Sequence, residues 1–218
     1  MTRSSLNEAT RIIAIRHGQT AWNAETRMQG QLDTALDARG RWQAQQLCRA
    51  LAHEPIEAIV ASDLSRALQT AAPLAQARGL RVRAERGLRE RCFGNFEGFT
   101  YTGIERHWPE DTVRWRARDP TFAPPRGESL ADFYARCVGV AQRLASDYAG
   151  RAIVWVTHGG VLDCLYRAAA RIALDAPRTW TLDNASINRL LHVDQGLMLV
   201  GWGDIRHLDA STADAPEA

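Results

Sequence analysis

Short apolar segments alternate with helix-like patterns along most of this chain, and this alternation limits the possible folds more than any other feature. The apolar segments are residues 12–15, 58–61, 80–82, 153–156, 187–193 and 197–202. Several are apolar throughout, as in strands that are covered on both faces of a sheet. Strands that alternate with helices form a mostly parallel sheet, so an α/β fold is predicted.

The predicted helices are marked by apolar residues that recur every three or four positions. They cover residues 42–51, 64–75, 130–148 and 161–172. Ser62 and Asp63 are candidate caps for the second helix, and Ser129 with Asp132 for the third. The last two strands are separated only by residues 194–196, which indicates an antiparallel hairpin at one sheet edge. The predicted fold is a three-layer sandwich, with helices on both faces of a mostly parallel sheet and an antiparallel edge hairpin.

The chain has 218 residues, which suits one domain. We expect this domain to span residues 11–208, between flexible segments at 1–10 and 209–218. The alternating pattern fails at residues 100–126, where Trp, Pro and Arg are mixed. This stretch, called the lid segment below, is predicted to be an insertion or lid.

Composition argues against several classes of protein. No apolar run approaches the roughly 20 residues of a membrane helix, and no secretion signal is recognisable, so a cytoplasmic protein without a membrane partner is expected. The net charge is only +2, and all 27 basic residues are scattered Arg, which argues against nucleic acid as a partner.

The Cys residues are too widely spaced for a metal site, so free thiols, no metal and no cofactor are expected. They are Cys48, Cys92, Cys137 and Cys164. A monomer and a homodimer are both compatible with the sequence.

Polar residues follow four of the predicted strands. They are Arg16-His17-Gly18, Ser62-Asp63-Leu64-Ser65-Arg66, Leu88-Arg89-Glu90 and Thr157-His158-Gly159-Gly160. In open α/β sheets, ligands bind outside the carboxyl ends of the strands. These residues are therefore expected to converge on one site.

The types of residue in this set fit a phosphate ester. Two guanidinium groups match the oxygens of a phosphate, and glycines at a helix start offer backbone amides to the same anion. A neutral imidazole can attack phosphorus, and a carboxylic acid can protonate the leaving oxygen. Glu90, close to the apolar Leu88 and Phe93, is the candidate acid.

Several further motifs accompany these residues in order. Arg16-His17-Gly18-Gln19-Thr20 is followed by Asn23, Arg27-Met28-Gln29-Gly30, Ser62 to Thr70, Leu88-Arg89-Glu90-Arg91, Phe93-Gly94-Asn95-Phe96-Glu97-Gly98, Gly127-Glu128-Ser129 and Thr157-His158-Gly159-Gly160. Together they resemble the histidine phosphatase superfamily, which has the phosphoglycerate mutase-like fold. The resemblance extends from about residue 12 to about residue 202.

This resemblance implies a role for each matching residue. His17 would be the phosphorylated nucleophile and Glu90 the general acid and base. The phosphoryl oxygens would be held by Arg16, Arg66 and His158, with a further hydrogen bond from Asn23. The substrate would also be placed by Gln29, Gly30 and the backbone of Gly159. No metal is required.

The same residues serve three possible functions. A phosphomonoesterase releases the phosphoryl group to water, a bisphosphoglycerate-primed phosphoglycerate mutase returns it to another hydroxyl, and a non-enzymatic protein only binds the phosphorylated ligand. Family mutases generally carry a longer insertion with adjacent Arg residues before the Gly-Glu-Ser motif. Residues 91–126 are shorter and contain no Arg-Arg pair, which favours a phosphatase of a small phosphorylated metabolite.

Some candidates stay open at this point. The lid segment contains Arg114, Arg116 and Arg118, which would suit an acidic substrate and keep the mutase possible. His107 is an outside candidate for substrate contact, whereas His53, His192 and His207 are expected to be structural or solvated. Only the family pattern selects Glu90 over the nearby Glu85, Glu97 and Glu105.

Overall fold

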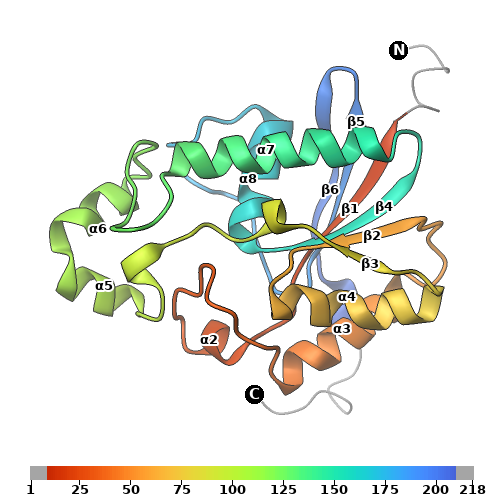
Figure 1. Cartoon of the computed structure of the whole chain (residues 1–218), viewed down its shortest axis with the longest axis horizontal. Helices are drawn as coiled ribbons and strands as arrows, with labels where there is room; N and C mark the ends of the chain where they lie inside the picture. Colours follow the sequence, from red (N-terminus) through yellow and green to blue (C-terminus); the bar gives the residue numbers. More distant parts are fainter. Residues whose placement is uncertain (1–8, 210–218) are drawn as a thin grey trace.

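A six-stranded sheet forms the centre of the computed structural model, which describes residues 9–209 (Figure 1). Its strands are β1 (Thr10–Arg16), β2 (Ala58–Ala61), β3 (Val82–Ala84), β4 (Ala152–Thr157), β5 (Ile187–Val193) and β6 (Gly196–Asp204). They lie in the order β3-β2-β4-β1-β5-β6. The first four are mutually parallel, and β5 is antiparallel to both β1 and β6. The predicted mostly parallel sheet with an antiparallel edge hairpin is confirmed.

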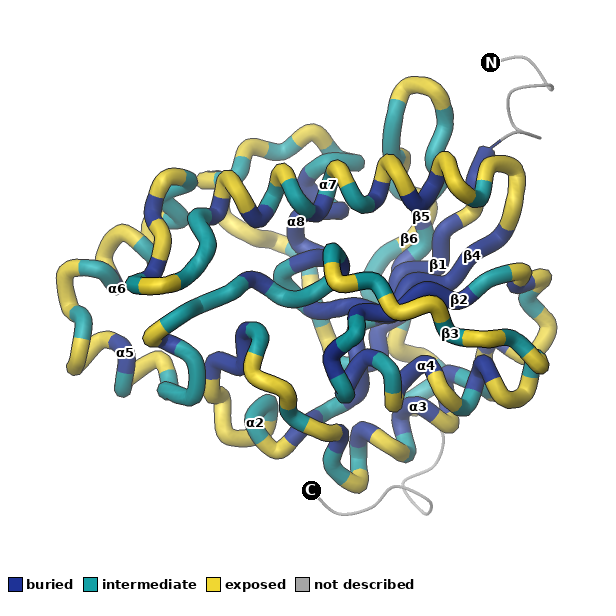
Figure 2. The backbone as a smooth tube through the Cα atoms, in the orientation of Figure 1, coloured by how far each residue is buried: buried dark blue, intermediate teal, exposed yellow. Residues whose placement is uncertain are grey.

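Helices cover both faces of the sheet because the central strands are apolar on both sides. In β1 and β4, Ile12 and Trp155 pack with α7 (Leu130–Asp147) and α8 (Gly159–Ala170). The alternate residues Ile13 and Val154 pack with α3 (Ala38–Ala50) and α4 (Ser65–Arg78) on the opposite face. Figure 2 shows these strands buried and the outer helix faces exposed. Each buried Leu or Ile contributes about 1.5–3 kcal/mol relative to an exposed one, so the two cores hold the layers together.

Two local predictions were wrong. The third strand lies two residues later than expected, and α4 has Leu64 at its N-cap with no side-chain cap. Ser62 and Asp63 do not cap α4 because they bond elsewhere: Ser62 contacts His158, and Asp63 pairs with Arg89. The other predicted cap is confirmed, since the Ser129 hydroxyl accepts a hydrogen bond from the backbone N–H of Asp132.

The first strand begins inside the N-terminal segment that was expected to be flexible. Strand β1 starts at Thr10, whose hydroxyl donates to the carbonyl of Ala145 at 2.8 Å, and Ala9 is buried. The last two residues of the expected flexible segment 1–10 therefore belong to the fold. The remainder of that segment, and residues 210–218 of the expected tail, lie outside the described residues.

The lid segment contains two short helices, α5 (Tyr101–His107) and α6 (Pro109–Arg116), at one end of the molecule in Figure 1. Ile104 and Phe122 of this segment form a separate hydrophobic cluster with Phe96, which precedes it. The other short elements are α2 (Ala21–Ala24), η1 (Arg86–Leu88), η2 (Gly94–Phe96) and η3 (Arg206–Leu208). Among the described helices, none has the length and apolar character needed to span a membrane.

Candidate active site

The strand order brings three of the predicted polar segments together. Strands β2, β4 and β1 are neighbours, with Arg16 paired to Thr157 and Ala61 to Val156 at their carboxyl ends. The backbone N–H of His17 donates to the carbonyl of Thr157 at 2.9 Å. The residues that follow these strands consequently begin at the same edge of the sheet, as expected for an open α/β fold.

A cavity of about 690 Å³ opens at this edge. Eight of the nine predicted site residues line it: Arg16, His17, Asn23, Gln29, Gly30, Arg66, Glu90 and Gly159. His158 lies behind the wall and is fully buried. The cavity is large enough for a small phosphorylated organic molecule.

His17 is buried with one ring nitrogen fixed. Its Nδ1 lies 2.7 Å from the carbonyl oxygen of Gly18. Because a carbonyl oxygen only accepts hydrogen bonds, Nδ1 carries the proton and Nε2 keeps its lone pair. Burial lowers the pKa of His17 well below its ordinary value of 6.5, and the charges of Arg66 and Arg16 lower it further. His17 is therefore a neutral imidazole with Nε2 available as a nucleophile.

Arg16 and Arg66 supply positive charge beside His17. Arg66 is fully buried and donates to the carbonyls of Leu32 and Gly30 at 2.9 and 2.7 Å. Arg16 donates to the carbonyl of Leu182, and its buried Nε has no partner within residues 9–209. Both side chains thus bond to neutral acceptors, which leaves their charges to attract an anion in the cavity.

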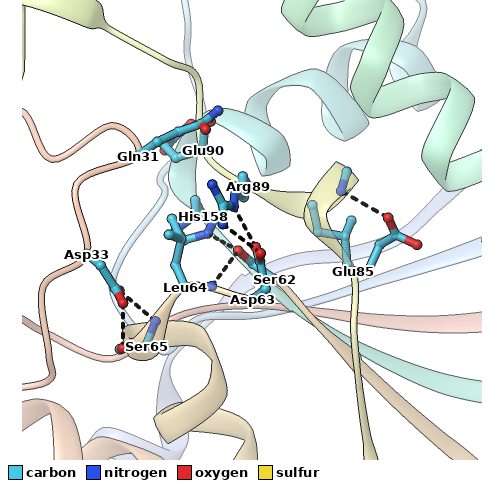
Figure 3. Close-up of polar contacts among 12 residues, drawn as sticks. Gln31, Asp33, Ser62, Asp63, Leu64, Ser65, Glu85, Arg89, Glu90 and His158 are labelled. Atoms are coloured by element: carbon cyan, nitrogen blue, oxygen red, sulfur yellow. Dashed lines mark hydrogen bonds and ion pairs between the residues drawn. The ribbon is translucent and has the colours of Figure 1, made fainter.

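His158 has both ring nitrogens occupied by protein groups. Its Nδ1 accepts a hydrogen bond from the Nε of Arg66 at 3.3 Å. Its Nε2 lies 2.8 Å from the Ser62 hydroxyl, a contact that Figure 3 shows. Burial also lowers the pKa of His158 well below 6.5, and the charge of Arg66 lowers it further. In this arrangement His158 orients Arg66, and its predicted direct contact with the phosphoryl group stays a prediction.

Glu90 reaches the site from the connection between β3 and α5. Its Oε1 accepts the backbone N–H of Arg91 at 2.8 Å, and its Oε2 accepts that of Gly160, in the first turn of α8, at 2.9 Å. A Cβ at Gly160 would lie 2.2 Å from Oε1 of Glu90. Glycine at position 160 therefore leaves room for the carboxyl group of Glu90 beside the first turn of α8.

The other predicted binding residues also present polar groups to the cavity. The side-chain oxygen of Asn23 accepts from Thr20, and that of Gln29 accepts from the Thr34 hydroxyl. Neither side-chain NH₂ has a partner within the described residues, so both are available to a ligand. Gly30 has φ of +52°, a conformation that favours glycine, and its carbonyl holds Arg66.

The structure also distinguishes the candidates that the sequence left open. His107 bonds to the Gly103 carbonyl, and it does not line the cavity. The competing carboxylates bind elsewhere: Glu85 pairs with Arg143, Glu105 pairs with Arg116, and Glu97 accepts from the backbone of Phe93. Of the four nearby Glu residues, Glu90 alone lines the cavity.

Sequence reasoning missed the connection between α8 and β5, residues 171–186. Asn184 donates to the carbonyl of His17 at 2.9 Å and to the side chain of Asn23 at 3.3 Å. Arg178, Trp180 and Asp183 line the cavity. This connection has no regular secondary structure and no motif used in the sequence analysis, so the sequence held no signal for its place beside the site.

The buried neutral histidines predict how stability depends on pH. An unfolded chain takes up protons near pH 6.5, whereas folded His17 and His158 stay neutral, so the unfolding free energy is expected to fall as pH drops below 6.5. Each group contributes about 1.4 kcal/mol per pH unit to the slope. Denaturant titrations between pH 7 and 5 in phosphate-free buffer measure this. In a His17→Asn variant one such group is lost, so the unfolding free energy should fall less steeply with pH than in the parent protein. An equal slope in the two proteins would contradict a neutral, buried His17.

Residues 9–209 contain no cluster of three His, Cys, Asp or Glu side chains that could hold a metal ion. The four Cys are free thiols, of which Cys137 and Cys164 are buried. The polar groups that line the cavity include imidazole, guanidinium, amide and carboxylate groups, a set suited to binding and transferring a phosphoryl group.

This site and fold correspond to a known family. The family model of the histidine phosphatase superfamily (branch 1) matches residues 12–205. The chain belongs to this superfamily.

Individual relatives cover most of the chain. It is 39% identical over 203 residues to phosphoglycerate mutase-like protein 4 of Arabidopsis thaliana, covering 91% of this chain and 86% of that protein. It is also 39% identical over 191 residues to the glucosyl-3-phosphoglycerate phosphatase of Mycobacterium tuberculosis, covering 84% and 85%. Among solved structures, YhfR of Bacillus stearothermophilus superposes with a TM-score of 0.86 and 30% identity, covering 91% and 99%.

Proposed function

We propose that this protein is a metal-independent phosphomonoesterase that hydrolyses a small phosphorylated metabolite through a phosphohistidine at His17. The observation that carries the proposal is the neutral His17 imidazole. Its Nδ1 is held by the Gly18 carbonyl, and the charges of Arg16 and Arg66 lie close enough to lower its pKa. A fixed, unprotonated nitrogen next to a site for an anion is the arrangement that nucleophilic attack on a phosphate ester needs.

In the first step, Nε2 of His17 attacks phosphorus and the bond to the ester oxygen breaks. Arg16 and Arg66 stabilise the negative charge on the phosphoryl oxygens, which is greatest in the transition state. Glu90, in its protonated form, gives its proton to the leaving oxygen, so that an alcohol departs. The product of this step is phosphohistidine with Glu90 as a carboxylate.

In the second step, water attacks the phosphohistidine. The Glu90 carboxylate takes a proton from the water as the new P–O bond forms and the P–N bond breaks. Inorganic phosphate leaves, and both His17 and Glu90 return to their starting forms. Asn23 and Gln29, whose NH₂ groups are available at the cavity, hold phosphoryl or substrate oxygens in both steps.

The lid segment favours a phosphatase over a phosphoglycerate mutase. The three arginines that suited an acidic substrate are engaged in ion pairs: Arg114 with Asp119 at 2.7 Å, Arg116 with Glu105 at 2.8 Å and Arg118 with Asp163 at 2.8 Å. Of the three, only Arg118 lines the cavity. The relative named glucosyl-3-phosphoglycerate phosphatase also favours a phosphatase. Other relatives are named as probable phosphoglycerate mutases, so the experiment below also tests for mutase activity.

The expected result is release of inorganic phosphate from phosphate monoesters without added metal and without interconversion of the two phosphoglycerates. Phosphate release from a panel of monoesters is measured beside the interconversion assay, with and without bisphosphoglycerate. Interconversion that depends on the primer and releases little phosphate would make the protein a mutase. Binding without any turnover would leave only a phospholigand-binding protein.

A further inference from the structure

Glu90 stands on a segment that has no regular secondary structure to hold it. Residues 89–93 are neither helix nor strand, and they follow the single turn of η1. Figure 1 shows this connection running from β3 toward α5 beside α7, and Figure 3 shows Arg89 and Glu90 on it. A catalytic side chain must be fixed within a fraction of an ångström, so such a segment needs support from neighbouring elements.

Arg136 of α7 supports this segment from one side. Its Nη1 donates to the carbonyls of Gly87 and Arg89 at 2.8 and 2.9 Å, and its Nη2 donates to that of Glu90 at 3.3 Å. One guanidinium group thus holds three carbonyl oxygens within four residues of the same connection. The planar guanidinium fork fixes their relative positions, which a Lys ammonium would not do.

Glu128 supports the segment just beyond Glu90. Its carboxylate accepts the backbone N–H of Cys92 at 3.0 Å, and its own N–H donates to the Cys92 carbonyl at 2.9 Å. Its carbonyl also accepts from the Nε of Arg91 at 3.0 Å. The contacts of Arg136 and Glu128 therefore flank Glu90 on both sides.

Arg136 and Glu128 are themselves joined. The Nε and Nη2 of Arg136 each donate to a Glu128 carboxylate oxygen at 2.8 Å, and both side chains are about three-quarters buried. Such a bidentate pair is geometrically specific, so it orients both groups toward the backbone they hold.

We propose that Arg136 and Glu128 form a positioning pair that holds the Glu90 side chain within hydrogen-bond distance of the leaving oxygen of the substrate. The inference rests on the proposed function, in which Glu90 is the acid that protonates that oxygen. The pair touches neither His17 nor the phosphate-binding arginines in the described structure, so its loss should affect proton donation and leave phosphate binding in place.

The test compares two substrates with different needs for a proton. The ester oxygen of an alkyl phosphate leaves readily only when it receives a proton and departs as an alcohol. Nitrophenolate leaves readily without a proton. For Arg136→Gln, kcat/KM for glycerol phosphate is expected to fall by about 10- to 100-fold, a part of what a general acid contributes, and kcat/KM for p-nitrophenyl phosphate by less than about threefold. The comparison uses kcat/KM because the later hydrolysis of the phosphohistidine is common to both substrates. The loss in Arg136→Lys should lie between that of Arg136→Gln and that of the parent protein.

Arg143 of the same helix provides the matched control. It pairs with Glu85 at 2.7 Å, and Glu85 accepts the backbone N–H of Gly87, so this pair touches the start of the same connection without reaching Glu90. Arg143→Gln should therefore keep the ratio of the two activities. Calorimetric binding of inorganic phosphate to each variant reports whether the phosphate site is intact, and Arg136→Lys and Glu128→Gln carry the test if Arg136→Gln does not fold.

The outcomes separate this inference from the proposed function. A larger loss on glycerol phosphate in Arg136→Gln, with phosphate binding retained, supports the positioning pair. Equal losses on both substrates, or the same change in Arg143→Gln, would overturn it while leaving the phosphatase in place. If Glu90→Gln itself shows no dependence on the leaving group, the acid role fails and the positioning pair fails with it.

Discussion

Replacing His17 by Ala is expected to lower phosphate release by about 10⁴-fold or more, the effect of removing the nucleophile from other enzymes that form covalent intermediates. The reason is that no other described imidazole has a free nitrogen at the cavity. His158 is behind the wall with both nitrogens engaged, and His107 lies outside the cavity. Steady-state turnover of p-nitrophenyl phosphate measures the loss.

Two further measurements make the His17 prediction specific. Rapid acid-free quenching of the parent protein during turnover should trap a phosphorylated chain, and His17→Ala should trap none. His107→Ala is the matched control, because it removes a histidine of the lid segment without touching the cavity. An alanine variant at position 17 with near-normal turnover would rule out the phosphohistidine mechanism.

Replacing Glu90 by Gln is expected to slow alkyl phosphates by about 10²- to 10⁴-fold, the usual contribution of a general acid. The amide keeps the size of the side chain, but its N–H groups are far too weakly acidic to protonate the leaving oxygen. Nitrophenyl phosphate should lose far less in the first step, because its leaving group needs little protonation. Comparison of kcat/KM for the two substrates measures the effect on that step, since kcat/KM includes only the steps through the departure of the leaving group.

A control for Glu90 comes from the lid segment. Glu105 is exposed and paired with Arg116 at 2.8 Å, so Glu105→Gln should leave the ratio of the two activities unchanged. Equal losses on both substrates in Glu90→Gln would mean that another group is the acid. Asp183 would then be the next carboxylate to test, because it also lines the cavity.

The layers of the fold could be predicted because the strands are short, apolar and separated by periodic helices. The pattern also indicated that β5 and β6 form an edge hairpin, since only three residues separate the two predicted strands. The third strand was placed two residues early because its exposed residues carry no apolar pattern, with Arg83 and Ala84 both exposed. Ser62 and Asp63 have the composition of helix caps, and only their partners in space, His158 and Arg89, reveal their use.

The convergence of residues that follow the strands could be predicted because the carboxyl ends of neighbouring parallel strands meet at one edge of the sheet. Sequence placed Arg16, His17 and Arg66 in one site, and the cavity contains all three. The pattern at the strand ends did not separate His17 from His158, since both follow a buried strand and precede glycine, and only the family resemblance gave them different roles. Their difference lies in hydrogen-bond partners that are far away in the chain.

The sequence by itself determined the class of fold, the family and the chemical groups of the site, because these depend on local periodicity and on residues next to strand ends. Only the tertiary structure decided which ring nitrogen of His17 is free, which groups hold Glu90 at the cavity and how the connection at residues 171–186 lines it. Those properties depend on contacts between distant segments, such as Asn184 with His17 and Arg136 with the Glu90 connection. Burial and hydrogen-bond geometry set the protonation states, and both are established only when the layers pack.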